Sequence, residues 1–210
     1  MKTNMLNRAG LIIVVLLMLI ANAAYAVEKG YEYTAFFGFT LNEVTLLDIQ
    51  KKLGNSPMTE TGDAGDYEAC LCYLLPSEYT IKFLSGELGG ANHVLEGYSI
   101  QKKITEEDEK CMHLSSSEAK RFKPEVGKLK IGMTKKELIK NFGKKIKWTK
   151  DEATIFFESK RKMTKKEIED MTSFSHEIIQ EPYFDIGISL ISTFKEGRMI
   201  KFTVWKAETY

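Results

Sequence analysis

The segment Ile131-Gly-Met-Thr-Lys-Lys-Glu-Leu-Ile-Lys-Asn-Phe-Gly143 has the pattern of a short helix with its own caps. Thr134 and Glu137 are spaced as a capping box, in which the hydroxyl accepts from a free backbone N–H and the carboxylate reaches back. Apolar residues then recur at helical spacing, and Gly143 stands where a left-handed C-cap is expected. A helix of about ten residues does not persist alone in water, so this one must pack on a sheet.

An earlier segment, Val44-Thr-Leu-Leu-Asp-Ile-Gln-Lys-Lys-Leu-Gly54, repeats the pattern without a gap. When Thr45 is aligned with Thr134, the acidic cap residue and the final glycine coincide as well, and two apolar positions match, Ile49 with Leu138 and Leu53 with Phe142. This match predicts a duplicated unit of one capped helix and one sheet.

A second match lies farther along the chain, between the turns Phe83-Leu-Ser-Gly86 and Phe194-Lys-Glu-Gly197. The offset is 89 at the helix caps (134 − 45) and 111 at the turns (194 − 83). The added length corresponds closely to a charged segment, 159–181, with its own Thr164-x-x-Glu167 cap. We expect a helical insertion there.

The final segment, 199–206, alternates apolar and polar residues, as is typical of a half-buried antiparallel strand. We therefore predict an α+β protein of two tandem units. Each unit is a short helix, or a helix pair, packed on an antiparallel sheet of about four strands. The units are expected at 27–103 and 126–210, joined by a polar linker at 104–125, with the helical insertion at 159–181.

The N-terminus has the features of a secretory signal peptide, residues 1–26. Two basic residues, Lys2 and Arg8, precede an uncharged apolar run at residues 11–20. The run leads to the small-x-small site Ala24-Tyr-Ala26. The run is short for a membrane span, and no cysteine lies near the site to carry lipid. We expect cleavage after Ala26 and a periplasmic or secreted product, with an uncleaved anchor as the alternative.

The charge balance argues against a nucleic-acid binder. The chain has 30 Lys and Arg against 29 Asp and Glu, and loss of the predicted signal removes two of the basic residues. A nucleic-acid binder would need a basic face to neutralise phosphates. Lysine-rich segments at 144–150 and 160–166 have acidic residues nearby, which favours a solvated face. The alternative is attraction to anionic lipid or to an acidic protein.

The three cysteines predict one disulfide, between Cys111 and either Cys70 or Cys72, with one thiol left over. The alternative joins Cys70-x-Cys72 with Cys111-x-His113 in a soft-metal site, since alternate strand residues share a face. This spacing is not the usual one for structural zinc, so we expect no metal and no cofactor. A Cys111–His113 nucleophile pair is a further alternative.

No catalytic signature is found in the sequence. The nucleophile elbow, the zinc-protease motif, the phosphate-binding loop and the dinucleotide fingerprint are all missing. We therefore expect a protein that is not an enzyme.

Aromatic residues in or beside the predicted strands are the candidate contact residues, because a few exposed Tyr and Trp anchors often dominate an interface. Trp205 is the strongest candidate for exposure, since its alternation neighbours Lys201 and Thr203 are polar. The alternative is that most of these rings pack between helix and sheet. The candidate binding residues are Trp205, Trp148, Tyr67, Tyr73 and Tyr79.

The pattern Gly-Met-Thr-x-x-Glu-Leu…Phe-Gly, followed by antiparallel strands and a Phe-Lys-x-Gly-Arg hairpin, resembles a superfamily of small envelope proteins. It includes the SmpA/OmlA (BamE-type) outer-membrane assembly lipoproteins and the β-lactamase inhibitor protein. The resemblance covers about residues 36–102 and 126–206. It implies a tandem layout in which two four-stranded sheets form a concave surface. No inhibitory residue of that family matches a position here, and the lipid-anchoring cysteine is absent.

Together these features predict an exported, non-enzymatic protein-binding module, such as an inhibitor or immunity-type partner of another envelope or secreted protein. One alternative is an accessory role in envelope assembly. Another is a metal- or redox-linked role through Cys70, Cys72 and Cys111. We expect neither a nucleic-acid partner nor stable insertion into a membrane after signal cleavage.

Overall fold

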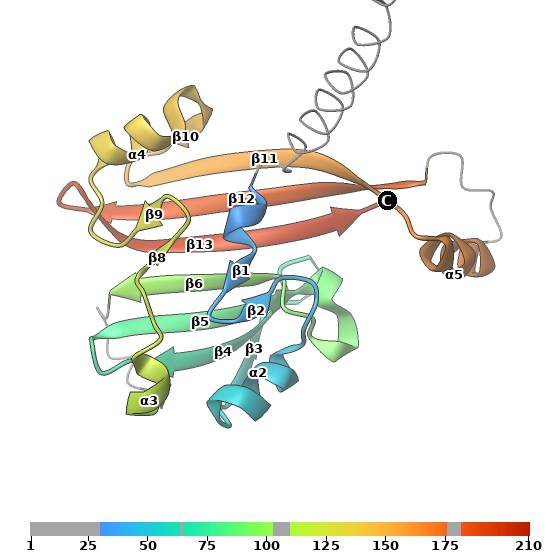
Figure 1. The fold of residues 1–210 in the computed structure, drawn as a ribbon, viewed down its shortest axis with the longest axis horizontal. Helices are drawn as coiled ribbons and strands as arrows, with labels where there is room; N and C mark the ends of the chain where they lie inside the picture. Colours follow the sequence, from blue (N-terminus) through green and yellow to red (C-terminus); the bar gives the residue numbers. More distant parts are fainter. Residues whose placement is uncertain (1–29, 64, 103–109, 176–181) are drawn as a thin grey trace, which may run out of the picture.

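The computed structural model describes residues 30–210 except 64, 103–109 and 176–181. Within these residues the protein is mixed α+β, and nine strands form one twisted sheet in the order β10-β11-β12-β13-β6-β5-β4-β3, with β7 beside β4. The β4–β7 pair is parallel and the other pairs are antiparallel. Two short hairpins, β1–β2 and β8–β9, lie apart from this sheet (Figure 1).

The elements of the first half are, in order, η1 (Tyr31–Tyr33), β1 (Ala35–Phe36), β2 (Phe39–Thr40), α2 (Leu46–Leu53), β3 (Met58–Thr61), β4 (Glu68–Leu74), β5 (Tyr79–Gly86), η2 (Glu87–Asn92) and β6 (Gly97–Lys102). Those of the second half are β7 (Met112–His113), α3 (Ser116–Ala119), β8 (Glu125–Val126), β9 (Leu129–Lys130), α4 (Lys135–Phe142), η4 (Gly143–Lys145), β10 (Ile146–Trp148), β11 (Glu152–Lys162), α5 (Lys165–Ser175), β12 (Tyr183–Lys195) and β13 (Arg198–Thr209).

Both predicted capping boxes are confirmed. At α2 the Thr45 N–H donates to the Asp48 carboxylate and the Asp48 N–H donates to the Thr45 hydroxyl, both at 3.2 Å. At α4 the equivalent bonds between Thr134 and Glu137 are 2.8 and 3.2 Å long. The glycines that end the two helices have positive φ, but their ψ values lie outside the left-handed helical region. These caps therefore differ from the ones predicted.

The helices α2 and α4 pack on one apolar core that runs through both halves of the chain. Leu46 and Ile49 of α2 and Leu138 of α4 are fully buried in it. Tyr98 of β6 and Val204 of β13 lie opposite each other in the sheet and are also fully buried. The strands predicted to form two sheets thus form a single sheet, because β6 pairs with β13.

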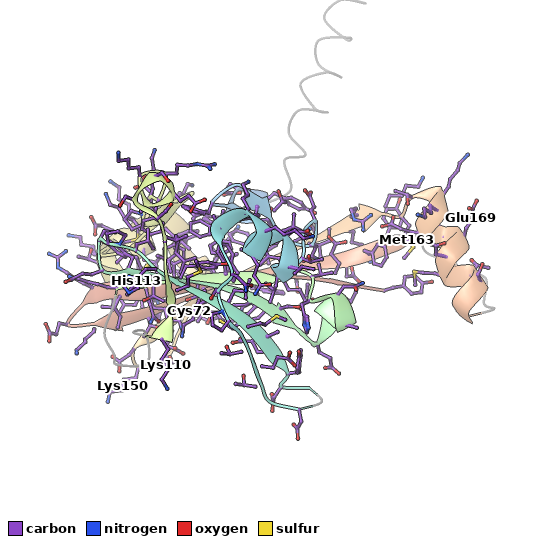
Figure 2. All side chains as sticks on the ribbon, turned by 90° about the horizontal axis from the view of Figure 1, so that it is seen from below. Cys72, Lys110, His113, Lys150, Met163 and Glu169 are labelled. Carbon is purple, nitrogen blue, oxygen red and sulfur yellow. A yellow bond between two sulfur atoms is a disulfide. The ribbon has the colours of Figure 1, made fainter. Side chains whose placement is uncertain are left out.

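The predicted linker and insertion both contain regular structure. In the linker, β7 pairs with β4, so the described residues after 109 are attached to the sheet. In the insertion, residues 159–162 continue β11 and the helix is α5, capped as predicted by Thr164 and Glu167. The remaining positions of both segments, 104–109 and 176–181, lie outside the described residues. Figure 2 shows α5 beyond the end of the sheet, where Glu169 is remote from Cys72.

A row of charges fastens the start of α5 to the sheet. The guanidinium of Arg161 donates two hydrogen bonds to Glu167, at 3.0 and 3.1 Å, and also contacts Glu208 at 2.7 Å. Glu208 in turn pairs with Lys206 at 2.6 Å, and Lys206 is buried. The hydrogen bonds from Arg161, with those from Thr164, lower the pKa of Glu167 from 4.5 to about 2.

Acidification should loosen α5 before it unfolds the sheet. Since the pKa of Glu167 is lower in the folded protein, its contribution to stability is complete above about pH 4.5 and is lost as the pH falls toward 2. Amide hydrogen exchange should show the protection factors of α5 falling a few-fold over that range. In Glu167→Gln they should already be low at pH 5, while β5 amides keep their protection in both proteins. Protection of α5 that does not change with pH would contradict this.

Candidate binding face

One face of the sheet carries the helices, and on the opposite face a row of residues crosses six strands, of which Phe156 is exposed and Leu84 is buried. Register places Phe156, Ser189, Trp205, Gly97, Leu84 and Cys70 side by side in that order, on β11, β12, β13, β6, β5 and β4. We call this set the transverse row, and the sheet face to which it belongs the open face. Within the described part of the chain, the segment at Cys111 reaches the open face through its disulfide to Cys72.

Two aromatic rings of the transverse row lie against glycines. A Cβ added to Gly97 would come within 2.7 Å of the Trp205 indole, and one added to Gly187 within 3.0 Å of the Phe156 ring. Because glycine has no side chain, the two rings can lie close to the sheet at these positions. Trp205 is consequently half-buried, not exposed as predicted, whereas Phe156 remains 48% exposed.

A shallow groove of about 670 Å³ begins at Phe156 and continues along the open face toward the C-terminal end of β13. Gly187 and Ala207 contribute small, apolar surface to it. Lys160 and Asp185 form an ion pair at 3.4 Å beside them, and both side chains are more than half exposed. The groove thus combines an aromatic wall with charged groups.

Trp205 is the one predicted contact residue that lies in the transverse row. Trp148 is 38% exposed, but its cross-strand neighbour is the buried Ala153, so it belongs to the helix side of the sheet. There its ring lies 5.7 Å from Phe194 and the Lys135 ammonium lies 5.4 Å from its centre. Trp148 therefore cannot share a contact surface with Trp205.

The three tyrosines are likewise engaged elsewhere. Tyr73 is fully buried and donates a hydrogen bond to the Gly54 carbonyl at 2.8 Å, so it has no surface to offer a partner. Tyr67 stacks on His93, with 6.3 Å between ring centres. Tyr79 packs against Phe122 at 5.5 Å. The structure does not bring the five predicted aromatic residues together.

Phe156 was missed as a contact residue, although the sequence contains a signal for it. Successive strand residues point to opposite faces, so Phe156 and Phe157 cannot both enter the core. Phe157 is the one that does, since its ring stacks on Tyr33 at 5.9 Å. One phenylalanine of the pair had to lie on the open face.

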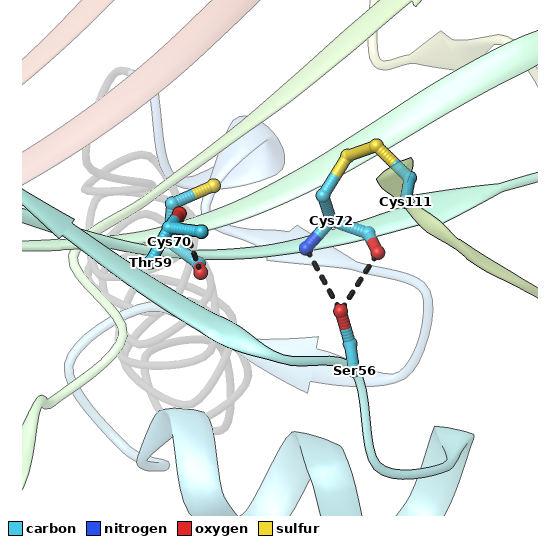
Figure 3. The surroundings of a disulfide bond; sticks show 5 residues. All are labelled: Ser56, Thr59, Cys70, Cys72 and Cys111. Carbon is cyan, nitrogen blue, oxygen red and sulfur yellow. Dashed lines mark hydrogen bonds between the residues drawn. A yellow bond between two sulfur atoms is a disulfide. The ribbon is translucent and has the colours of Figure 1, made fainter. Parts of the chain in front are cut away.

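The predicted disulfide is confirmed and joins Cys72 to Cys111, across 39 residues of sequence (Figure 3). The Ser56 hydroxyl donates to the Cys72 carbonyl at 2.8 Å and accepts from the Cys72 N–H at 3.3 Å, which holds β4 at this point. A bond from the Leu114 N–H to the Leu74 carbonyl continues the attachment. The disulfide thus ties the segment after residue 109 to the edge of the sheet.

Cys70 keeps its thiol and lies on the same side of β4 as Cys72 (Figure 3). Burial raises the pKa of this thiol to about 11, so it is protonated and weakly nucleophilic at neutral pH. With Cys72 and Cys111 joined, the four-ligand soft-metal site considered from the sequence is not formed. Across the described ranges no other group of three or more His, Cys, Asp or Glu is placed to hold a metal ion.

No helix in the described part of the chain is long and apolar enough to cross a membrane. Comparison with protein-family models, with curated proteins and with solved structures found no match.

The disulfide should contribute about 4 kcal/mol to the free energy of unfolding, because it closes a loop of 39 residues in the unfolded chain. Urea denaturation of Cys111→Ser is expected to show this loss. Cys70→Ala, the matched control on the same strand, should lose less than about 1 kcal/mol because it removes no cross-link. Equal losses in the two variants would show that the disulfide has no special role in stability.

Proposed function

We propose that this protein is a non-enzymatic binding module whose open face contacts another protein. The observation that carries the proposal is a pair of aromatic side chains in one row of the open face, of which Phe156 is exposed and Trp205 is half-buried. Large rings that are already held in place lose little conformational entropy on binding, and such rings commonly dominate interface energies. The charged groups beside them would supply a polar rim.

The fold would be a duplication of one unit, at 27–103 and 126–210. A short hairpin, a capped helix and four antiparallel strands follow one another twice, as β1–β2, α2, β3–β6 and as β8–β9, α4, β10–β13. The N-cap threonines also correspond, because each forms an isolated bridge with a residue just before or at the start of the last strand: Thr45 with Val94 and Thr134 with Arg198. These matches support the tandem layout that the family resemblance implies.

The partner would be another envelope or secreted protein, and the module an inhibitor or immunity-type protein. A structural disulfide fits an oxidising compartment, in keeping with the predicted signal peptide and a periplasmic or secreted location. The resemblance to small envelope proteins that include the β-lactamase inhibitor protein favours the same class. A redox role has less support, because the remaining Cys70 side chain is half-buried and burial raises the pKa of its thiol.

Substitution of Trp205 or Phe156 should weaken partner capture at least about tenfold, the loss expected for an interface anchor. The measurement is quantitative affinity capture from an envelope and secreted-protein extract, with immobilised wild type, Trp205→Ala and Phe156→Ala. Trp148→Ala is the matched control, since it removes a tryptophan of moderate exposure from the helix side of the sheet. Circular dichroism and thermal unfolding establish that each variant is folded.

The identity of the captured protein separates the candidate roles. A soluble enzyme that loses activity in the complex supports inhibition, whereas outer-membrane assembly components support the accessory role. If Trp205→Ala and Phe156→Ala still captured the partner fully, the open face would be ruled out as the contact surface. It would also be ruled out if Trp148→Ala weakened capture as much as they did.

A further inference from the structure

One edge of the sheet contains a free stretch of strand. On its outer side β11 pairs with β10 only at 153–155, and no other described strand lies along residues 156–162 there. On its inner side β11 pairs with β12 as far as Lys162. Unpaired N–H and C=O groups along such an edge are a template for another strand.

The hydrogen-bond pattern identifies which residues present these groups. The Thr149 N–H donates to the Glu152 carbonyl, which therefore faces the β10 side, whereas the Asp151 carbonyl accepts from Phe194 of β12. Backbone groups alternate sides along a strand, so every second residue from Glu152 faces outward, as Glu158 and Lys160 do. Ser159, like Asp151, faces β12. The free edge therefore offers outward-facing backbone groups on both sides of Ser159.

We propose that this edge pairs with the same edge of a second copy of the chain, antiparallel, about a two-fold axis at Ser159. Glu158 then lies opposite the partner's Lys160, and Lys160 opposite the partner's Glu158. All four residues present outward-facing backbone groups, so each pair exchanges main-chain hydrogen bonds. The nine-stranded sheet continues from one copy into the other, and the two open faces lie on the same side.

The charge pattern selects this register. Moving the axis one residue toward the N-terminus places Glu158 opposite the partner's Glu158. Moving it one residue toward the C-terminus places Lys160 opposite the partner's Lys160. Like charges directly opposite one another destabilise strand pairing. A slip of one residue in the pairing instead sets outward-facing backbone groups against inward-facing ones.

The neighbouring strand extends the complementarity. Lys160 already pairs with Asp185 at 3.4 Å, across β11 and β12. In the dimer Lys160 lies between Asp185 and the partner's Glu158, so the charges alternate across the junction. Beside an apolar strand, Lys162 would gain no counter-charge, which discourages unspecific pairing. The edge thus pairs preferentially with the same edge of a second copy of the chain.

Charge reversal tests the register. Sedimentation equilibrium of the protein purified after export should show a reversible dimer, and Glu158→Lys and Lys160→Glu should each raise the dissociation constant at least about tenfold, because two symmetric attractions become repulsions. The double variant restores opposite charges in both pairs across the dimer junction, and its loss of the Lys160–Asp185 pair acts within each copy, so its dissociation constant should return to within about threefold of wild type. Thermal unfolding verifies that each variant is folded.

A cross-linking experiment tests the axis independently of charge. In the Cys70→Ser background, Ser159→Cys should form a covalent dimer rapidly under diamide oxidation, since side chains of this pair lie about 5 Å apart at the axis. Lys162→Cys, exposed on the same strand but away from the axis, should react at least tenfold more slowly. A wild-type protein that remains monomeric at all accessible concentrations, failure of the double variant to recover, or equal cross-linking rates would each overturn the proposal.

Because these measurements require no other protein, they are independent of the proposed function. A monomeric wild type that still loses partner capture on Trp205→Ala would refute the edge pairing and leave the open-face proposal standing. A wild-type protein that dimerises but captures no other protein would refute the open-face proposal and leave the edge pairing standing.

Discussion

The pairing of β6 with β13 is the interaction on which the architecture depends. It joins strands that are distant in sequence, from Lys201 opposite Gln101 to Trp205 opposite Gly97. Without it, each half of the chain would have a four-stranded sheet with an additional exposed edge. With it, Tyr98 and Val204 lie side by side in one core, and the helices of both halves pack over a continuous sheet.

The same junction also positions the open face. Gly97 is the register partner of Trp205, and the absence of a side chain there lets the indole lie across the two central strands. Substituting a larger residue at this position would push the ring outward, because a Cβ would approach it to 2.7 Å. The central strand pair therefore joins the two halves of the sheet and sets how far its main aromatic side chain extends from the surface.

Local features of this fold could be predicted from the sequence, and long-range ones could not. The capping boxes depend on residues three apart, and the alternation of 199–206 assigned Trp205 to the polar side of its strand. The continuous sheet depends on a pairing between strands about a hundred residues apart, for which no local pattern exists. Tyr73 was misjudged for a related reason. In Cys70-Leu-Cys-Tyr-Leu-Leu75 apolar or weakly polar residues stand on both faces, so the period of two that would assign Tyr73 to the core is hidden.

The two ends of the sheet are closed off in different ways, and this difference follows from the strand lengths. At one end β3 is a short strand, Met58–Thr61, whose residues are all exposed, and β7 covers part of β4 beyond it. At the other end β10 has three residues, whereas β11 has eleven, so β11 extends well past its neighbour. The extension of β11 leads to α5, and Arg161, which anchors that helix, also lies in this overhanging part. The segment 156–175 thus has two consequences at once: it places a helix beyond the sheet, and it leaves a strand edge whose backbone no described neighbour satisfies.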